Sequence, residues 1–181
     1  MLKALQETGQ LENTVFVFTS DNGFFWNEHH LGDKRCAYEE SIRVPFLVRY
    51  PKLIKAGTVR EEMVLNIDVA PTFLELAGVE VPGEMQGKSL VPLFAEGGGK
   101  WRDSILLQYF YEPHYENVPG WQAVRTQGWK YIEYEKFPGM EEMYDLKSDP
   151  HEMKNLVKDP GQVEQVKKMK GELERLKDAY K

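Results

Sequence analysis

Two hydrophobic patterns alternate along the chain and predict its strands and helices. Residues 15–18 and 46–48 are continuous apolar runs of strand length, typical of strands buried on both faces of a parallel sheet. Leu2, Leu5 and Leu11 have nearly helical spacing, so the chain is expected to begin within a helix. Further helices are expected at 38–42, 66–78, 90–95 and 161–180, and Asn66 or Asp68 can cap the second of these.

The pattern changes after the glycines at 97–99, the best candidate for a domain boundary. Short strands separated by turn residues are predicted at 105–109, 122–126, 130–135 and 142–146, which together indicate a small antiparallel sheet. The alternation of Tyr131, Glu133 and Glu135 predicts that one face of this sheet is exposed to solvent. We therefore expect two parts, the end of an α/β domain at 1–99 and a small subdomain at 100–181.

The last predicted helix carries an apolar stripe. Its members are spaced three and four apart, at Val163, Val166, Met169, Leu173, Leu176 and Tyr180. We expect the stripe to pack on the chain's own sheet, with a partner-binding helix as the alternative.

Composition narrows the functional classes. The 181 residues carry a net charge of −6, which argues against nucleic acid as a partner. No apolar stretch is long enough for a membrane span, and the first ten residues lack the apolar core of a signal peptide. The single cysteine, Cys36, excludes an internal disulfide framework and a multi-cysteine zinc site.

The polar cluster Thr19–Gly23 directly follows the first apolar run. In open α/β sheets, ligands collect at the carboxyl ends of strands. Asp21 and Asn22 offer two hard oxygen ligands, which suit calcium or magnesium better than zinc or copper. The simpler interpretation is a turn that only ends the strand.

Charged and aromatic residues follow in a long loop and in a later tyrosine-rich segment. Lys34 lies thirteen residues after Asp21 and could stabilise an anionic ester beside a cation, although a loop lysine is usually just solvated. Arg43 is expected to form a local ion pair with Glu39 or Glu40 that holds the loop in place, with direct substrate contact as the alternative.

Several blocks of the sequence resemble, in the same order, the carboxyl-terminal half of the type I sulfatases of the alkaline-phosphatase superfamily. These blocks are TSDNG, NEHHLGDKRCAYEESIRVPFLVRYP, NIDVAPTFLELAGVEVPGEMQGKSLVPLF, AVRTQGWKYIEYE and EEMYDLKSDPHEMKNL. The resemblance covers nearly all of the chain. It implies an α/β fold, the carboxyl-terminal portion of an alkaline-phosphatase-like fold, with a four-stranded antiparallel sheet and a helix as its subdomain.

The resemblance also assigns functions to matching positions. It implies that Asp21 and Asn22 are calcium ligands, with magnesium less suited, and that Lys34 contacts the sulfate and stabilises the departing ester oxygen. It implies pocket roles for His29 and His114, with a surface histidine as the alternative at the second position. Asp21 supplies negative charge to the metal, and Asn22 a neutral oxygen.

One position departs from the family. Sulfatases attack sulfur with a formylglycine made from the cysteine of a Cys-x-Pro/Ala-x-Arg signature, whereas Ala37, Tyr38, Glu39 and Glu40 follow Cys36. The nucleophile is therefore expected in an amino-terminal part outside this chain. We expect the 181-residue chain alone to be inactive and prone to self-association. We also expect it to bind calcium weakly, because two protein oxygens leave most of the ligand shell to water.

The resemblance implies a sulfuric ester hydrolase acting on a carbohydrate or aryl sulfate, secreted or periplasmic as the complete enzyme. Two alternatives stay open. A phosphodiesterase or phosphonate monoester hydrolase of the same superfamily has a similar strand end, although histidine more often follows the aspartate there, so Asn22 favours sulfate. The chain could also be a non-catalytic binding or structural module.

Overall fold

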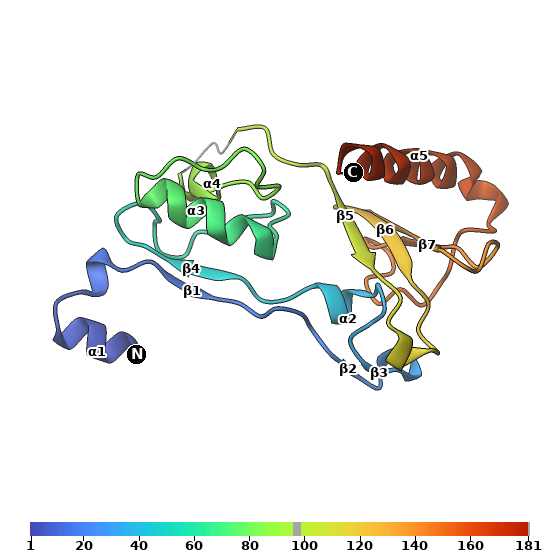
Figure 1. Cartoon of the computed structure of the whole chain (residues 1–181), viewed down its shortest axis with the longest axis horizontal. Helices are drawn as coiled ribbons and strands as arrows, with labels where there is room; N and C mark the ends of the chain where they lie inside the picture. The colour runs from blue at the N-terminus through green and yellow to red at the C-terminus, as the bar shows by residue number, and fades with distance from the viewer. Residues whose placement is uncertain (96–98, 181) are drawn as a thin grey trace. The chain divides into compact units, whose positions relative to one another are not determined.

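The computed structural model describes residues 1–95 and 99–180, and the chain forms two compact units (Figure 1). The first comprises Met1–Asp21 and Pro45–Trp101, and the second Asn22–Val44 and Arg102–Lys181. Gly97 and Gly98, in the predicted boundary, lie outside the described residues, and Gly99 has a φ of +71°. The division at residue 99 therefore stays a prediction.

The first unit contains short strands and helices. Its elements are α1 (Leu2–Glu7), η1 (Leu11–Asn13), β1 (Phe16–Phe18), β4 (Leu47–Arg49), η3 (Asn66–Asp68), α3 (Val69–Leu76) and α4 (Val91–Phe94). β1 pairs with β4 in antiparallel register, Val17 opposite Val48, whereas the apolar runs are typical of strands in a parallel sheet. An apolar run indicates burial and does not encode strand direction. Phe18 and Leu47 are 56% and 60% exposed within this chain, so the predicted burial on both faces is wrong at these two positions.

Asp68 and Thr72 tie α3 to the segment that precedes α4. The Asp68 side chain is fully buried and accepts 2.8 Å hydrogen bonds from the amides of Leu65 and Lys88. The Thr72 hydroxyl accepts a 2.8 Å bond from the amide of Leu90. Asp68 is the N-cap residue of α3 but its side chain makes no capping hydrogen bond to that helix, so the expected side-chain cap was wrong: the carboxylate binds amides outside α3 instead. Leu90, Leu93 and Phe94 form the core beside these contacts.

The second unit is built on the predicted antiparallel sheet, whose strand order is β5-β6-β7-β8. The four strands are Ser104–Tyr109, Trp121–Thr126, Trp129–Tyr134 and Glu142–Asp145, so every predicted strand end is correct to within one residue. The remaining elements are β2 (Phe25–Trp26), η2 (Glu28–His30), β3 (Gly32–Asp33), α2 (Glu39–Ile42), η4 (Pro113–Tyr115), η5 (Pro160–Gln162) and α5 (Val163–Ala179).

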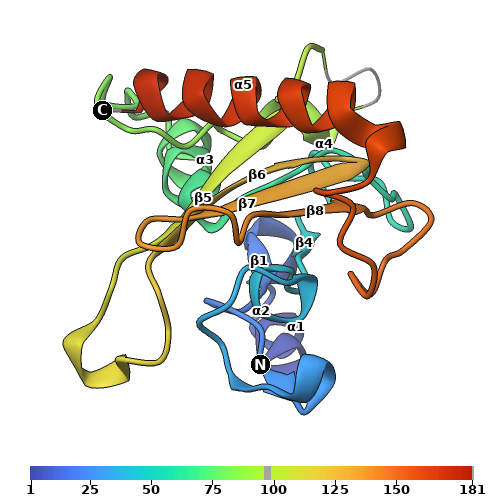
Figure 2. The same cartoon turned by 90° about the vertical axis from the view of Figure 1, so that its right-hand side faces the viewer.

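Both faces of this sheet are covered. Helix α5 lies along one face (Figure 2), where Met169, Leu173 and Leu176 pack on Tyr131 and other core residues. Tyr131 is only 1% exposed, so the prediction of a solvent-exposed face is wrong at this position. The helical stripe packs on the chain's own sheet as expected, except at its exposed ends, Val163 and Tyr180.

The opposite face of the sheet packs against the segment that precedes α2. Ala37 joins Ala123, Ile132 and Tyr144 in one buried cluster, with Tyr38 and Ile42 against it. This packing explains why residues 22–44 belong to the second unit. Across the described residues, no helix combines the length and apolar composition that crossing a membrane requires.

Candidate active site

Gly23 brings the end of the Thr19–Gly23 cluster against α2. Its amide donates a 2.7 Å hydrogen bond to the carbonyl of Ser41. A Cβ atom at this position would lie 1.9 Å from the carbonyl oxygen of Glu40, so only glycine permits this approach. The glycine of the motif therefore fixes Asn22, its neighbour, relative to α2.

Asn22 and Lys34, twelve residues apart, meet in the structure. The Lys34 ammonium donates a 3.0 Å hydrogen bond to the Asn22 Oδ1 atom. The Asn22 amide nitrogen donates a 2.7 Å bond to the Gly23 carbonyl, which orients the side-chain oxygen toward the lysine. The Ser41 hydroxyl in turn donates to the main-chain carbonyl of Lys34. Lys34 is exposed, so its ammonium is accessible to an anion from solvent.

The loop that leads to Lys34 has an unusual backbone. Asn27, His29, His30 and Asp33 have φ angles of +94°, +52°, +56° and +84°. Non-glycine residues rarely adopt positive φ, and clusters of them are found where a functional loop is held in one conformation by its surroundings. The backbone before Lys34 is therefore a shaped loop rather than an open linker.

His29 takes part in holding that loop. Its ring stacks on Tyr38 with centroids 4.1 Å apart, and Phe25 meets it edge-on at 6.3 Å. The His29 Nε2 atom lies 3.5 Å from Glu40 Oε2. These contacts join the loop to α2 and give His29 a structural role. A direct contact of His29 with substrate stays a prediction.

Arg35 connects the Lys34 loop to the tyrosine-rich segment. Its guanidinium lies 3.3 Å from the centroid of the Tyr115 ring, and its Nε atom lies 3.4 Å from Glu112 Oε1. Asp33 pairs with the same guanidinium. His114, exposed beside Tyr115, is thus carried on a segment anchored next to Lys34. Sequence reasoning missed Arg35, although the many tyrosines at 109–117 indicated that this segment differs from a strand core.

A buried group of four charged side chains fixes α2 to the sheet, and we call it the buried ion network. Arg125 pairs through two nitrogens with Glu39, at 2.9 and 3.0 Å. The fully buried Lys130 ammonium lies 2.9 Å from Glu39 Oε1, 2.7 Å from Glu152 Oε1 and 2.9 Å from the Ala37 carbonyl oxygen. The Glu39 amide donates a 2.7 Å bond to Glu152 Oε2.

The electrostatics of the buried ion network favour ionised Glu39. Burial raises its pKa, but the hydrogen bond from Arg125 and the charge of Lys130 outweigh burial and lower the pKa to about 2. Burial dominates at Glu152 and raises its pKa. The expected local pair of Arg43 with Glu39 or Glu40 was wrong, because Glu39 binds Arg125 and Lys130 whereas Glu40 lies against His29. Partners about ninety residues away cannot be inferred from local spacing.

Cys36 has the environment of a structural thiol. Burial raises its pKa, and the nearby charges of Glu142 and Asp33 raise it further. The reactive form of cysteine is the thiolate, which such surroundings disfavour. This agrees with the absence of the sulfatase signature around Cys36.

Asp21 lies three residues after the end of β1, in an exposed position. Its Oδ1 atom accepts a 3.3 Å bond from the Ser20 hydroxyl. The Asn66 amide nitrogen donates 3.0 Å bonds to the main-chain carbonyls of Ser20 and Asp21, which holds this turn in place. Sequence reasoning assigned Asn66 only to helix capping.

The donor types at Asp21 and Asn22 fit calcium as part of a shell. A carboxylate and an amide oxygen are hard donors, but calcium takes six to eight of them. Among residues 1–95 and 99–180, no group of three or more histidine, cysteine, aspartate or glutamate side chains could hold a metal ion. Two adjacent donors therefore account for only part of a calcium site.

Comparison with known proteins places this geometry in a family context. The family model described as N-sulphoglucosamine sulphohydrolase, C-terminal, matches residues 27–179. An N-acetylglucosamine-6-O-sulfatase of Bacteroides thetaiotaomicron is 44% identical over 155 residues, which cover 84% of this chain and 28% of that protein. The multifunctional alkaline phosphatase superfamily protein PehA of Trinickia caryophylli is 34% identical over 161 residues, covering 82% of this chain and 31% of PehA.

A solved structure confirms the fold. It is described as a complex with its substrate, D-glucosamine-2-N,6-O-disulfate, and superposes with a TM-score of 0.93 at 41% identity. The match covers 99% of this chain and 37% of that one. The chain thus spans about a third of the length of the relatives it matches, and the expected α/β fold with a four-stranded antiparallel sheet and closing helix is confirmed.

Proposed function

Because the chain belongs to the family of N-sulphoglucosamine sulphohydrolase C-terminal domains, we propose that it supplies one side of the active site of a sulfuric ester hydrolase. The observation that carries this proposal is the 3.0 Å contact between the Lys34 ammonium and Asn22 Oδ1. It brings an exposed cation and an amide together at the end of a loop with several positive φ angles, where an anionic ester can bind from solvent.

Each residue has a distinct task in the proposed reaction. Lys34 binds the sulfate group and stabilises the negative charge that develops on the ester oxygen as it departs. Asn22 orients that ammonium and offers a neutral oxygen. Asp21 and Asn22 would hold calcium, which when bound neutralises part of the sulfate charge. His29 and His114 are proposed to contact the remainder of the substrate.

The proposed substrate is a sulfate ester of a carbohydrate. Four relatives are named for sulfatase activity on N-acetylglucosamine, and one solved relative holds a sulfated glucosamine. An aryl sulfate is the alternative, since an arylsulfatase of Clostridium perfringens is 34% identical over 154 residues. The exposed η4 segment with His114 is a suitable place for sugar recognition because it is anchored beside Lys34 through Arg35.

The nucleophile of the reaction is proposed to lie outside these 181 residues. A formylglycine would supply the hydrated aldehyde that attacks sulfur, and Cys36 is not in the signature that forms one. We therefore expect no sulfate release above a buffer control from the 181-residue polypeptide incubated with glucosamine 6-O-sulfate. Measurable turnover would show that this chain contains its own nucleophile.

A second candidate is hydrolysis of phosphonate or phosphate esters. It is supported by the similarity to PehA, whose name describes a multifunctional protein of the superfamily. The test compares kcat/KM for 4-nitrophenyl sulfate and for a phosphonate monoester in an active protein that contains this chain. We expect the sulfate ester to be the better substrate, and a preference for the phosphonate would favour the second candidate.

A further inference from the structure

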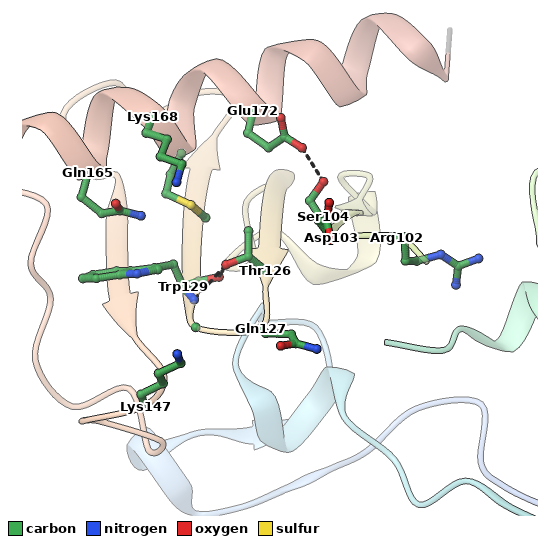
Figure 3. Close-up of a pocket in the computed structure, with 12 residues that line it drawn as sticks. Arg102, Asp103, Ser104, Thr126, Gln127, Trp129, Lys147, Gln165, Lys168 and Glu172 are labelled. Atoms are coloured by element: carbon green, nitrogen blue, oxygen red, sulfur yellow. Dashed lines mark hydrogen bonds between the residues drawn. The ribbon is translucent and has the colours of Figure 1, made fainter. Parts of the chain in front are cut away.

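A cavity of about 530 Å³ lies in the second unit, between α5 and the turn that joins β6 to β7 (Figure 3). Its volume is in the range of small-ligand sites. It is lined by residues at the start of β5, in that turn and on α5, together with Lys147. Asn22, His29, Lys34 and His114 are not among the lining residues, so the cavity is separate from the proposed active site.

The cavity is positively charged in an otherwise acidic chain. Its lining contains three cationic side chains and two acidic ones, whereas the whole chain carries a net charge of −6. One of the acidic residues, Glu172, is already engaged, because it accepts a hydrogen bond from Ser104 and pairs with Arg175 at 2.7 Å. One of the cationic residues, Arg102, has an interaction of its own as well, so the attraction for an anion comes from the two lysines, Lys147 and Lys168.

Two lysines carry the positive charge near the indole of Trp129. Figure 3 shows Lys168 reaching from α5 toward the indole of Trp129, and Lys147 reaching toward it from the other side. Within the described part of the chain, neither ammonium has a hydrogen bond or an ion pair, although the charge of Lys168 acts on Glu172 and that of Lys147 on Asp145. Each retains its full capacity to donate hydrogen bonds to a ligand.

The indole between these lysines adds an apolar surface. Trp129 is half-buried, with part of it packed against the core under α5. Its backbone is fixed by Thr126, whose hydroxyl accepts a 3.0 Å bond from the Trp129 amide and donates a 3.2 Å bond to its carbonyl. The amide of Gln165 is half-buried beside it and has no hydrogen-bond partner in the described residues.

We propose that this cavity, which we call the Trp129 pocket, binds a sulfated sugar unit. The indole offers a flat apolar surface for the C–H face of a sugar ring, and Gln165 offers donors and an acceptor for hydroxyl groups. The two ammonium groups, one on each side of the indole, can each bind a sulfate group on their own side of the ring. A simple inorganic anion would use only the lysines and leave the indole and the amide unmatched. The ligand class rests partly on the proposed function, since a second sulfated unit of the same polymer would tether the substrate.

The test is a calorimetric titration of the full chain with a sulfated glucosamine-containing oligosaccharide. Two comparison ligands are used. One is the same oligosaccharide with its sulfates removed and its carboxylates retained, and the other is inorganic sulfate. We expect the double variant Lys147→Glu/Lys168→Glu to weaken binding by about tenfold or more. The matched control Lys154→Glu/Lys167→Glu changes the same charge at exposed lysines outside the pocket and should shift Kd less than about twofold.

A Lys34→Ala arm separates this proposal from the proposed active site. Binding at the Trp129 pocket should be unchanged in that variant, whereas binding at the active site should weaken. Equal losses in the two double variants would overturn the proposal in favour of diffuse attraction. No binding by the wild-type chain, or equal affinity for the sulfated and desulfated oligosaccharides, would overturn it as well.

Discussion

At the scale of single residues, the proposed site depends on the meeting of Asn22 and Lys34. The sequence could predict both as candidates, because a strand-end Asp-Asn-Gly cluster and a family resemblance point to them. It could not predict that the amide oxygen of Asn22 faces the ammonium, since that follows from the Asn22 bond to Gly23 and from the serine bond to the Lys34 backbone.

The close packing of Gly23 on α2 can be tested by a single substitution. In Gly23→Ala the new Cβ would collide with the Glu40 carbonyl, so α2 must move away from Asn22. We expect a loss of about 1–3 kcal/mol in the free energy of unfolding, measured by urea denaturation. The control is Gly32→Ala, where a Cβ meets nothing within 4 Å. Equal stability of both variants would contradict the close packing of Gly23 on α2.

At the scale of elements, α2 is positioned by the buried ion network. The strands, α2 and α5 were predictable because hydrophobic periodicity reports local structure. The burial of Lys130 was not, since its partners come from α2, from the loop before it and from a turn after β8. A lysine in a predicted strand is ordinarily read as exposed.

The low pKa of Glu39 predicts how the network responds to acid. Its folded-state pKa of about 2 lies below the ordinary value of 4.5, so its stabilising effect is present above about pH 4.5 and is lost as the pH falls toward 2. We expect Glu39→Gln to reduce the free energy of unfolding by about 3 kcal/mol at pH 7. The difference from wild type should shrink as the pH approaches 2.

The pH series is measured by urea denaturation from pH 7 downward, with the exposed Glu116→Gln as control. That variant should match the wild-type chain within about 0.5 kcal/mol throughout. A Glu39→Gln deficit that stayed constant with pH would show that the carboxylate charge is not what stabilises α2.

At the scale of the whole molecule, family blocks along the sequence predicted the fold class, which structural comparison confirmed. The grouping of residues 22–44 with the four-stranded sheet was not predicted, because it arises from packing such as that of Ala37 on Ile132. The antiparallel pairing of β1 with β4 was also missed. Self-association of the chain stays a prediction; its exposed Phe18 and Leu47 are candidates for such a contact.

The central claim, that this chain supplies the sulfate-binding cation of a sulfatase, is tested most directly by Lys34→Ala. In an active protein that contains this chain, we predict that kcat/KM for a sulfate ester falls by about 10²–10³, because the charge aimed at the departing oxygen is lost. The exposed Lys55→Ala serves as control, and urea denaturation should show both variants folded. Wild-type kinetics in Lys34→Ala would contradict the account.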